Sequence, residues 1–231
     1  MRIDFTIKVF LFVISGIWEY VLEVFILSNV QNMIRATEAD KDLIVKILTS
    51  AFLENKSVNY IIRQDKFREK RIKALMEYSF DSCDLFGEIY LSEDRKACAL
   101  VSFPDRKKIG LKSILLDMKL ILRSTGVANI SKVLTREKLI SKNYPGSRIY
   151  YLWFIGVAPE NQNRGFGKKL LAEIIADASR VSRTIYLETS TEKNLPWYEK
   201  AGFEIYNQLN FGYTLFLLKR KSEQSLAQQK K

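Results

Sequence analysis

Histidine is absent from the 231 residues of the chain. Because imidazole is the usual base beside a catalytic serine or cysteine, Ser-His-Asp and Cys-His arrangements are excluded. Metal sites that depend on histidine ligands are excluded as well. Proton transfer in any reaction must therefore fall to Glu, Asp, Tyr, Lys, a chain terminus or water.

Cysteine is scarce, and the two that occur, Cys83 and Cys98, do not form a C-x-x-C pair. A disulfide framework is not expected from such a pair, and a reducing cytoplasm fits the sequence best. We expect both cysteines to be small buried apolar side chains, and we expect no metal site.

Long hydrophobic runs are also missing. The uncharged stretch 9–18 is followed by Glu19 and Glu23, and it is far shorter than the about 20 residues of a membrane-spanning helix. No convincing cleavage site of a signal peptide follows. Residues 1–32 form a hydrophobic extension with three open interpretations: a translation start that lies at Met33, an extra helix, or a peripheral membrane anchor. We favour the first of these over membrane contact.

Acidic residues are outnumbered, since 37 Lys and Arg against 26 Asp and Glu give a formal net charge of +11. This excess attracts polyanions, including the phosphates of a cofactor. It is spread along the chain and does not form a basic patch interleaved with aromatic residues, so no nucleic-acid partner is expected. We expect one domain at 33–219 and a polar basic tail at 220–231.

The order of periodic segments predicts a mixed α/β (α+β) fold. Strands are expected at 33–37, 86–91, 97–103, 149–157, 184–189, 203–208 and 213–218. Helices are expected between 37 and 52, within 66–79 and 107–141, and at 167–178 and 194–201. The long helical segment should break near Thr125-Gly126. Its first piece has one apolar face, made of Leu111, Ile114, Leu115, Met118, Ile121 and Leu122.

The segment 157–171, VAPENQNRGFGKKLL, predicts a strand end, a turn and a helix start. Pro159 ends the strand, and Gly165 and Gly167 let the backbone approach a ligand closely. The first N–H groups of a helix lack internal partners and lie at the positive end of its dipole, so they suit a phosphate. Basic side chains follow at the same end of the helix: Arg164, Lys168 and Lys169.

Three phosphate-binding motifs could use such a turn. A Walker loop needs glycine at 162 and Ser or Thr at 169, where the chain has Gln162 and Lys169. A dinucleotide fingerprint needs glycine at 170, where Leu170 stands. The remaining pattern, Gln-x-x-Gly-x-Gly preceded by Val-x-Pro, resembles the pyrophosphate loop of the GNAT acetyltransferase superfamily.

A second motif is similar to the closing signature of that superfamily. Asn194 is followed by Tyr198-Glu199 and then by Gly202-Phe203. The resemblance implies that Tyr198 protonates the departing coenzyme A thiolate and that Asn194 contacts the pantetheine arm. A phenol can serve as such an acid. The alternative is that Tyr198 is a core aromatic beside Trp197 and Phe203.

The resemblance also implies a fold and a cofactor site. The expected architecture is a mostly antiparallel central sheet with a splayed strand pair, flanked by helices, and acetyl-CoA is the expected co-substrate. Backbone groups of the 149–157 strand would bind pantetheine and polarise the thioester carbonyl, and the loop amides would bind the pyrophosphate. The implied cofactor residues are Ile155, Gly156, Val157, Gln162, Asn163, Arg164, Gly165, Phe166, Gly167, Lys168 and Asn194.

Within the superfamily, Leu187-Glu188-Thr189-Ser190 before Asn194 looks like puromycin N-acetyltransferase and its relatives. The reaction would be direct transfer to a primary amine of a small molecule in a ternary complex. A protonated amine needs a base, and because 150–157 contains no carboxylate, Glu188 is the candidate, acting directly or through water. Its alternative role is structural. Tyr151 or Trp153 would line the acceptor pocket.

Two other functions stay open: a protein or peptide N-acetyltransferase, and a non-catalytic module that binds coenzyme A or nucleic acid. The chain is expected to act as a monomer or homodimer.

Overall fold

The computed structural model describes residues 33–144 and 148–221. The hydrophobic extension 1–32 and nearly all of the basic tail lie outside the described residues, so their expected roles stay predictions. No helix in the described ranges is long and apolar enough to cross a membrane.

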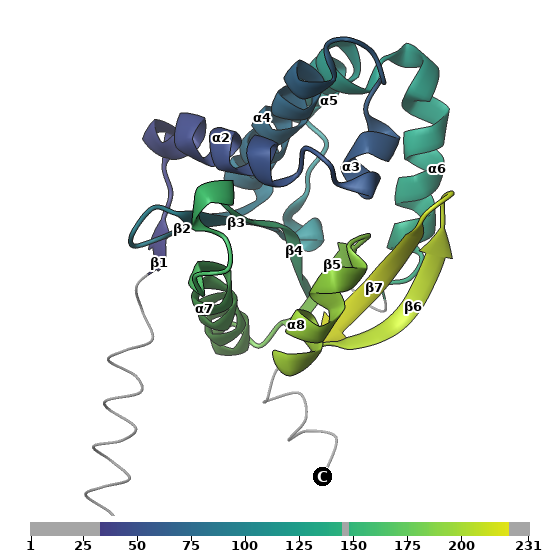
Figure 1. Ribbon diagram of the computed structural model, residues 1–231. Coiled ribbons are helices and arrows are strands. Elements are labelled where there is room, and N and C mark those ends of the chain that lie inside the picture. Colours follow the sequence, from purple (N-terminus) through teal and green to yellow (C-terminus); the bar gives the residue numbers. More distant parts are fainter. Residues whose placement is uncertain (1–32, 145–147, 222–231) are drawn as a thin grey trace, which may run out of the picture. The chain divides into compact units, whose positions relative to one another are not determined.

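A seven-stranded sheet with the order β1-β2-β3-β4-β5-β7-β6 forms the centre of the described unit (Figure 1). Neighbouring strands are antiparallel except β4 and β5, which are parallel. The mixed, mostly antiparallel sheet expected from the sequence is therefore confirmed. The strands are β1 (Met33–Arg35), β2 (Gly87–Ser92), β3 (Ala97–Ser102), β4 (Ile149–Val157), β5 (Thr184–Thr189), β6 (Glu204–Asn210) and β7 (Thr214–Arg220).

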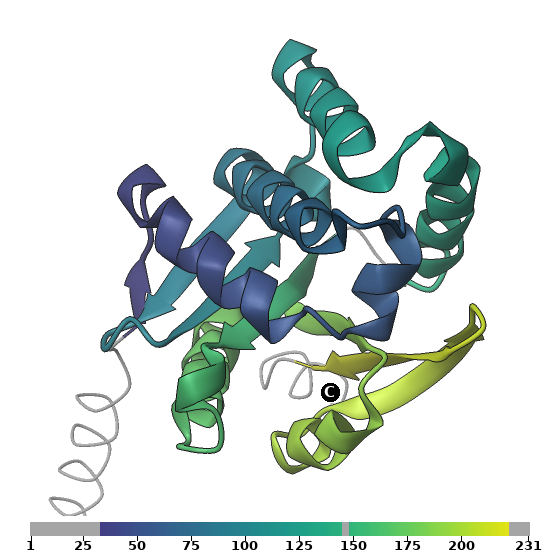
Figure 2. The same cartoon turned by 45° about the horizontal axis from the view of Figure 1, so that its top comes forward.

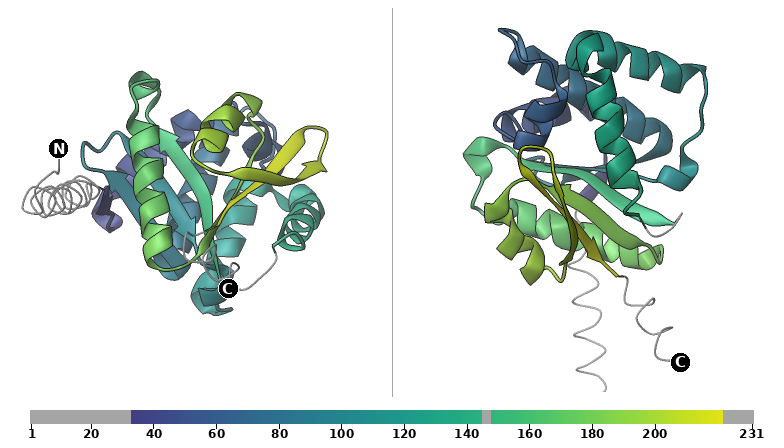
Figure 3. Two further views of the ribbon diagram at one scale, coloured as in Figure 1. Left: turned by 90° about the horizontal axis from the view of Figure 1, so that it is seen from below. Right: turned by 90° about the vertical axis from the view of Figure 1, so that its right-hand side faces the viewer.

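Helices cover both faces of this sheet (Figures 1 and 2). They are α2 (Lys41–Ala51), α3 (Lys56–Ile61), α4 (Arg68–Phe86), α5 (Leu111–Leu120), α6 (Ile130–Ser141), α7 (Phe166–Arg180) and α8 (Leu195–Lys200). One apolar cluster joins α2 and α4 to one face of β2, β3 and β4, and a second joins α7 to the opposite face. Seen from below, α7 lies across the strands (Figure 3, left).

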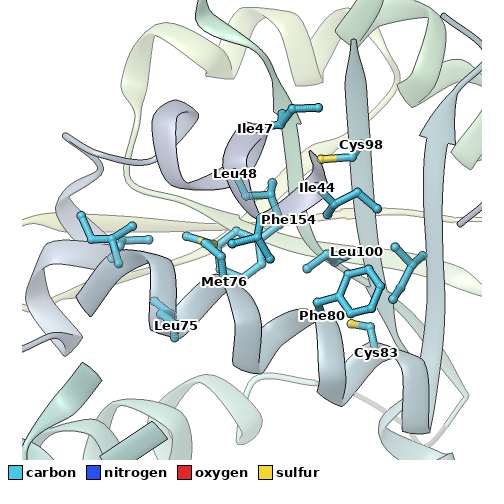
Figure 4. Close-up of a cluster of buried hydrophobic side chains, with 14 of the residues drawn as sticks. Ile44, Ile47, Leu48, Leu75, Met76, Phe80, Cys83, Cys98, Leu100 and Phe154 are labelled. Carbon is cyan, nitrogen blue, oxygen red and sulfur yellow. The ribbon is translucent and has the colours of Figure 1, made fainter. Parts of the chain in front are cut away.

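The cluster beneath α2 and α4 is closely packed and fully apolar (Figure 4). Leu48 from α2, Phe80 from α4 and Leu100 from β3 are all 0% exposed. Cys83 and Cys98 lie in the same cluster, both reduced and buried, as the sequence predicted. Burial raises the pKa of both thiols, because a thiolate would lose its hydration there.

Helix α3 was not predicted. It begins after Asn55, whose Oδ1 accepts a hydrogen bond from the Val58 amide at 3.0 Å, as an N-cap does. Helix α4 ends at Phe86, several residues beyond the predicted end. Phe67 lies at the N-cap position directly before α4 and is 46% exposed.

The predicted break in the long helical segment is present. Between α5 and α6 the chain forms a π-helical turn at Ile121–Thr125, and Gly126 follows with φ 74°. A positive φ is a conformation that glycine adopts without a steric penalty. The apolar face of α5 is exposed instead of buried, because the helix packs on α4 through its other side.

Strands β4 and β5 part after a short contact. Their parallel register covers only Ile149↔Thr184, Tyr150↔Ile185 and Tyr151↔Tyr186. β5 pairs with β7 from Ile185 to Thr189, so it stays in the sheet on its other side. The expected splayed pair is therefore present, and the edge of β4 beyond Tyr151 has no strand partner among the described residues.

Candidate functional site

A cleft of about 960 Å³ opens where β4 and β5 separate. Its walls are the second half of β4, the loop before α7, the end of β5, the segment leading into α8, and the turn between α2 and α3. Both predicted catalytic residues, Tyr198 and Glu188, line it. The predicted cofactor residues that also line it are Ile155, Gly156, Val157, Gln162, Asn163, Gly165, Phe166, Gly167, Lys168 and Asn194. Arg164 is exposed and lies outside the lining.

The loop before α7 has a conformation that presents backbone amides. Asn163 and Gly165 both have positive φ, 62° and 87°. Asparagine tolerates that region and glycine adopts it freely, which accounts for the residue types at both positions. A side chain at Gly165 would meet nothing within 4 Å, so the space in front of this turn is open. The arrangement suits an anion at the start of the 15-residue helix α7.

Two of the predicted cofactor residues also have packing roles. A Cβ on Gly156 would lie 2.9 Å from Leu48 Cδ2, so this glycine lets α2 approach β4 closely. The Gln162 side chain donates from Nε2 to the Val157 carbonyl at 3.3 Å and ties the loop back to the strand end. Both residues therefore shape the cleft wall.

A bulge in β4 redirects the strand beside the cleft. Leu100 pairs with Phe154 and Val101 pairs with Leu152, which leaves Trp153 as the extra residue. Such an insertion bends a strand and increases its local twist. Trp153 stacks on Tyr151 with ring centroids 6.4 Å apart, and both line the cleft.

Glu188 is held by two phenols. Its Oε1 accepts a hydrogen bond from Tyr144 Oη at 2.5 Å, and its Oε2 accepts one from Tyr151 Oη at 2.6 Å. Burial raises the pKa of Glu188, while the two phenols and the positive charge of Arg136 act in the opposite direction. The result is a carboxylate less hydrated than a surface one, in the lining of the cleft.

Arg136 connects α6 to this cluster. It is buried, its Nη2 donates to Ser57 Oγ at 2.6 Å, and its Nε lies 3.5 Å from Tyr213 Oη. The main chain of Ser57 in turn donates to Ser190 Oγ at 3.2 Å. These contacts fasten α3 and α6 to the end of β5, so the cleft wall opposite β4 is a braced structure.

Tyr198 lies on α8, is 5% exposed and lines the cleft. Its ring contacts Trp197 and Phe203, with centroids 4.6 and 5.6 Å away. These ring contacts are those of the core alternative. Tyr198 also lines the cleft, and its role as the acid stays a prediction. Burial raises the pKa of Tyr198, which keeps the phenol protonated at neutral pH, as an acid requires.

Sequence reasoning missed Tyr144 and Arg136. Tyr144 follows α6 and Arg136 lies on α6, and neither residue belongs to a recognised motif. Tyr144 contacts Glu188, and the charge of Arg136 acts on Glu188, only through the tertiary fold. The Tyr-x₆-Tyr spacing of Tyr144 and Tyr151 gives no signal of this contact.

The comparisons with known proteins agree with this geometry. Residues 126–205 match the family model described as an acetyltransferase (GNAT) domain. A structure titled histone acetyltransferase HPA2 and related acetyltransferase, from Corynebacterium glutamicum, has 20% identity and a TM-score of 0.62, over 83% of this chain and 96% of that chain. Arylalkylamine N-acetyltransferase 2 from Aedes aegypti has 14% identity and a TM-score of 0.56, over 82% and 97%.

A third similar structure is the C-terminal condensation domain of Ebony in complex with beta-alanyl-dopamine, at 10% identity and a TM-score of 0.61, over 82% of this chain and 97% of that chain. At these identities the structures show the fold alone. Together with the family match over residues 126–205, they show that this chain has the GNAT fold. This agreement supports an enzyme that transfers acetyl groups.

The described residues contain no group of three or more Cys, Asp or Glu side chains placed to hold a metal ion.

Proposed function

We propose that the enzyme moves the acetyl group of acetyl-CoA directly to a primary amine of a small molecule in a ternary complex. The observation that supports this most is the continuity of the cleft. One cavity connects the amide-presenting turn at Gly165 with the half-buried carboxylate of Glu188, and Tyr198 lines the same cavity.

On the cofactor side, the unpaired edge of β4 from Ile155 to Val157 offers backbone groups to the pantetheine amides, and one of its N–H groups can polarise the thioester carbonyl. The amides from Gln162 to Gly167 are the pyrophosphate donors, and Asn194 contacts the pantetheine arm. Arg164 and Lys168 are exposed at the same end of α7 and add positive charge for the phosphates.

On the acceptor side, Glu188 takes a proton from the ammonium group, directly or through water, so that the neutral amine can attack the thioester carbon. The new C–N bond forms, the C–S bond breaks, and Tyr198 protonates the departing thiolate. The phenol then recovers its proton from solvent.

The part of the cleft that would hold the acceptor amine is lined by aromatic side chains, so it favours an amine with an apolar or aromatic body. The rings of Phe52, Trp153 and Phe154 line the cleft beside Tyr151, and Phe52 and Phe154 meet edge to face at 5.0 Å. The resemblance to puromycin N-acetyltransferase and its relatives supports a small-molecule acceptor of this kind. A cytoplasmic location fits the two buried, reduced cysteines, and monomer or homodimer stays our expectation.

An amine panel tests this proposal. Purified enzyme with acetyl-CoA should acetylate hydrophobic primary amines at a kcat/KM well above that for short peptides with free amino termini. The opposite ranking would favour the peptide acetyltransferase. Binding of acetyl-CoA without turnover of any amine would favour the non-catalytic module.

A further inference from the structure

Helix α5 and the residues directly before and after it carry a row of exposed apolar side chains that is separate from the cleft. Leu111, Met118 and Leu122 are 75%, 51% and 70% exposed. Apolar residues of this size are common on surfaces singly, but a contiguous row on one helix face indicates an interaction site. The full row, here called the outer stripe, is Ile109, Leu111, Ile114, Leu115, Met118 and Leu122.

The outward direction of the stripe is fixed by contacts on the opposite side of the helix. Asp117 accepts a hydrogen bond from Tyr78 Oη of α4 at 2.8 Å. Ser113 is buried and accepts from the Gly110 amide at 3.0 Å, and Leu120 packs against the core cluster beneath α4. The helix is therefore docked through its more polar side, which is the reverse of an ordinary surface helix.

Basic residues accompany the stripe. The segment 106–123 contains six basic residues and one acidic residue, Asp117, for a net charge of 6 − 1 = +5. Lys112 and Lys119 are exposed, and each follows a stripe residue directly, so with 3.6 residues per turn they flank the stripe on the same side. The basic residues are Arg106, Lys107, Lys108, Lys112, Lys119 and Arg123.

We propose that the outer stripe binds the surface of a membrane that contains anionic phospholipids. An apolar helix face bordered by lysines is the arrangement that inserts shallowly among acyl chains while ammonium groups meet lipid phosphates. A second copy of the chain fits less well, because a two-fold contact through the stripe would bring the flanking lysine rows together. An anionic surface neutralises the same charges.

The experiment uses the full chain and co-sedimentation with vesicles of phosphatidylcholine, alone or mixed with phosphatidylglycerol. We expect binding to the mixed vesicles that weakens as salt is raised. The variant L111S/L122S should lower the partition coefficient at least about tenfold by removing apolar contact, and K112Q/K119Q should lower it about tenfold on mixed vesicles only. The charge-matched control K46Q/K200Q, on exposed lysines of α2 and α8, should bind like the parent.

All variants should keep their circular dichroism spectra and their acetyl transfer to a soluble amine, since the changed side chains lie outside the cleft lining. The proposal is overturned if the parent does not bind mixed vesicles. It is also overturned if the stripe variants bind them as tightly as the parent, because another part of the chain would then provide the membrane contact. An equal loss of vesicle binding in K46Q/K200Q would also overturn it. So would a parent protein that does not bind vesicles but forms a dimer, if L111S/L122S dissociates that dimer.

Discussion

Among the described residues, two clusters pair one carboxylate with two tyrosines, on opposite faces of the sheet. On the α7 side, Asp177 Oδ2 accepts from Tyr90 Oη and from Tyr150 Oη, both at 3.0 Å. On the other side, Glu188 accepts from Tyr144 and Tyr151. Tyr150 and Tyr151 are neighbours on β4, and successive side chains of a strand point to opposite faces.

The two clusters differ in what they can reach. Asp177 forms an ion pair with Arg180 on its own helix and does not line the cleft. Glu188 and Tyr151 line the cleft. The same set of groups therefore braces the fold in one place and can exchange a proton with a ligand in the other. Both carboxylates have two tyrosine partners, and they differ in that only Glu188 lines a cavity.

The largest expected effect separates the two carboxylates. E188Q keeps the shape of the side chain but removes the base, so kcat/KM for amine acetylation should fall about 10²-fold or more. D177N should change kcat/KM little and should lower the free energy of unfolding by about 1–3 kcal/mol, because it disturbs buried hydrogen bonds. Steady-state release of free coenzyme A and urea unfolding measure the two effects. Equal activity of E188Q and parent would make Glu188 structural as well.

Tyr198→Phe should have the next largest effect. The ring contacts with Trp197 and Phe203 stay, while the proton donor is lost, so we expect kcat to fall about 10–100-fold with unchanged affinity for acetyl-CoA. Tyr150→Phe, a phenol on the Asp177 side, is the matched control and should keep kcat. A Tyr198→Phe enzyme with full kcat and lowered stability would make Tyr198 a core aromatic only.

The pH dependence should distinguish the tyrosine partners. The base acts when ionised, so kcat/KM rises with pH through the pKa of Glu188. Tyr151→Phe and Tyr144→Phe each remove a hydrogen bond that lowers this pKa, so the acidic limb of the profile should move to higher pH. Tyr90→Phe, on the other face, should leave the limb in place. A limb unmoved by both cleft variants would show that another group titrates.

The smallest effect on kinetics is expected for the exposed basic side chains near the start of α7. Arg164→Ala and Lys168→Ala should each raise KM for acetyl-CoA about 3–10-fold at low salt without changing kcat, because exposed cations contribute modest, screened attraction. Measuring KM over a range of salt concentrations tests this, with Lys46→Ala as the control.

The sequence allowed prediction of the parts of the site that are local. The glycine turn and the Tyr198 motif are short continuous segments, and their residue types indicate the local backbone conformation. The structure places both beside one cleft. The surroundings of Glu188 could not be predicted, because Tyr144 contacts it from 44 residues away and the charge of Arg136 acts on it from 52 residues away. Likewise, the periodicity of α5 predicted an apolar face, but the partner of that face depends on which side of the helix packs against α4.

Calorimetric titration of the full chain with acetyl-CoA tests the central claim most directly. The account predicts one site per chain with micromolar affinity, abolished by Gly167→Leu, since a Cβ at Gly167 already lies 3.2 Å from Val157 Cγ2 beside the cleft. D177N should bind like the parent. Absence of binding heat in the parent, or full affinity in a folded Gly167→Leu variant, would contradict the assignment of this cleft as the acetyl-CoA site.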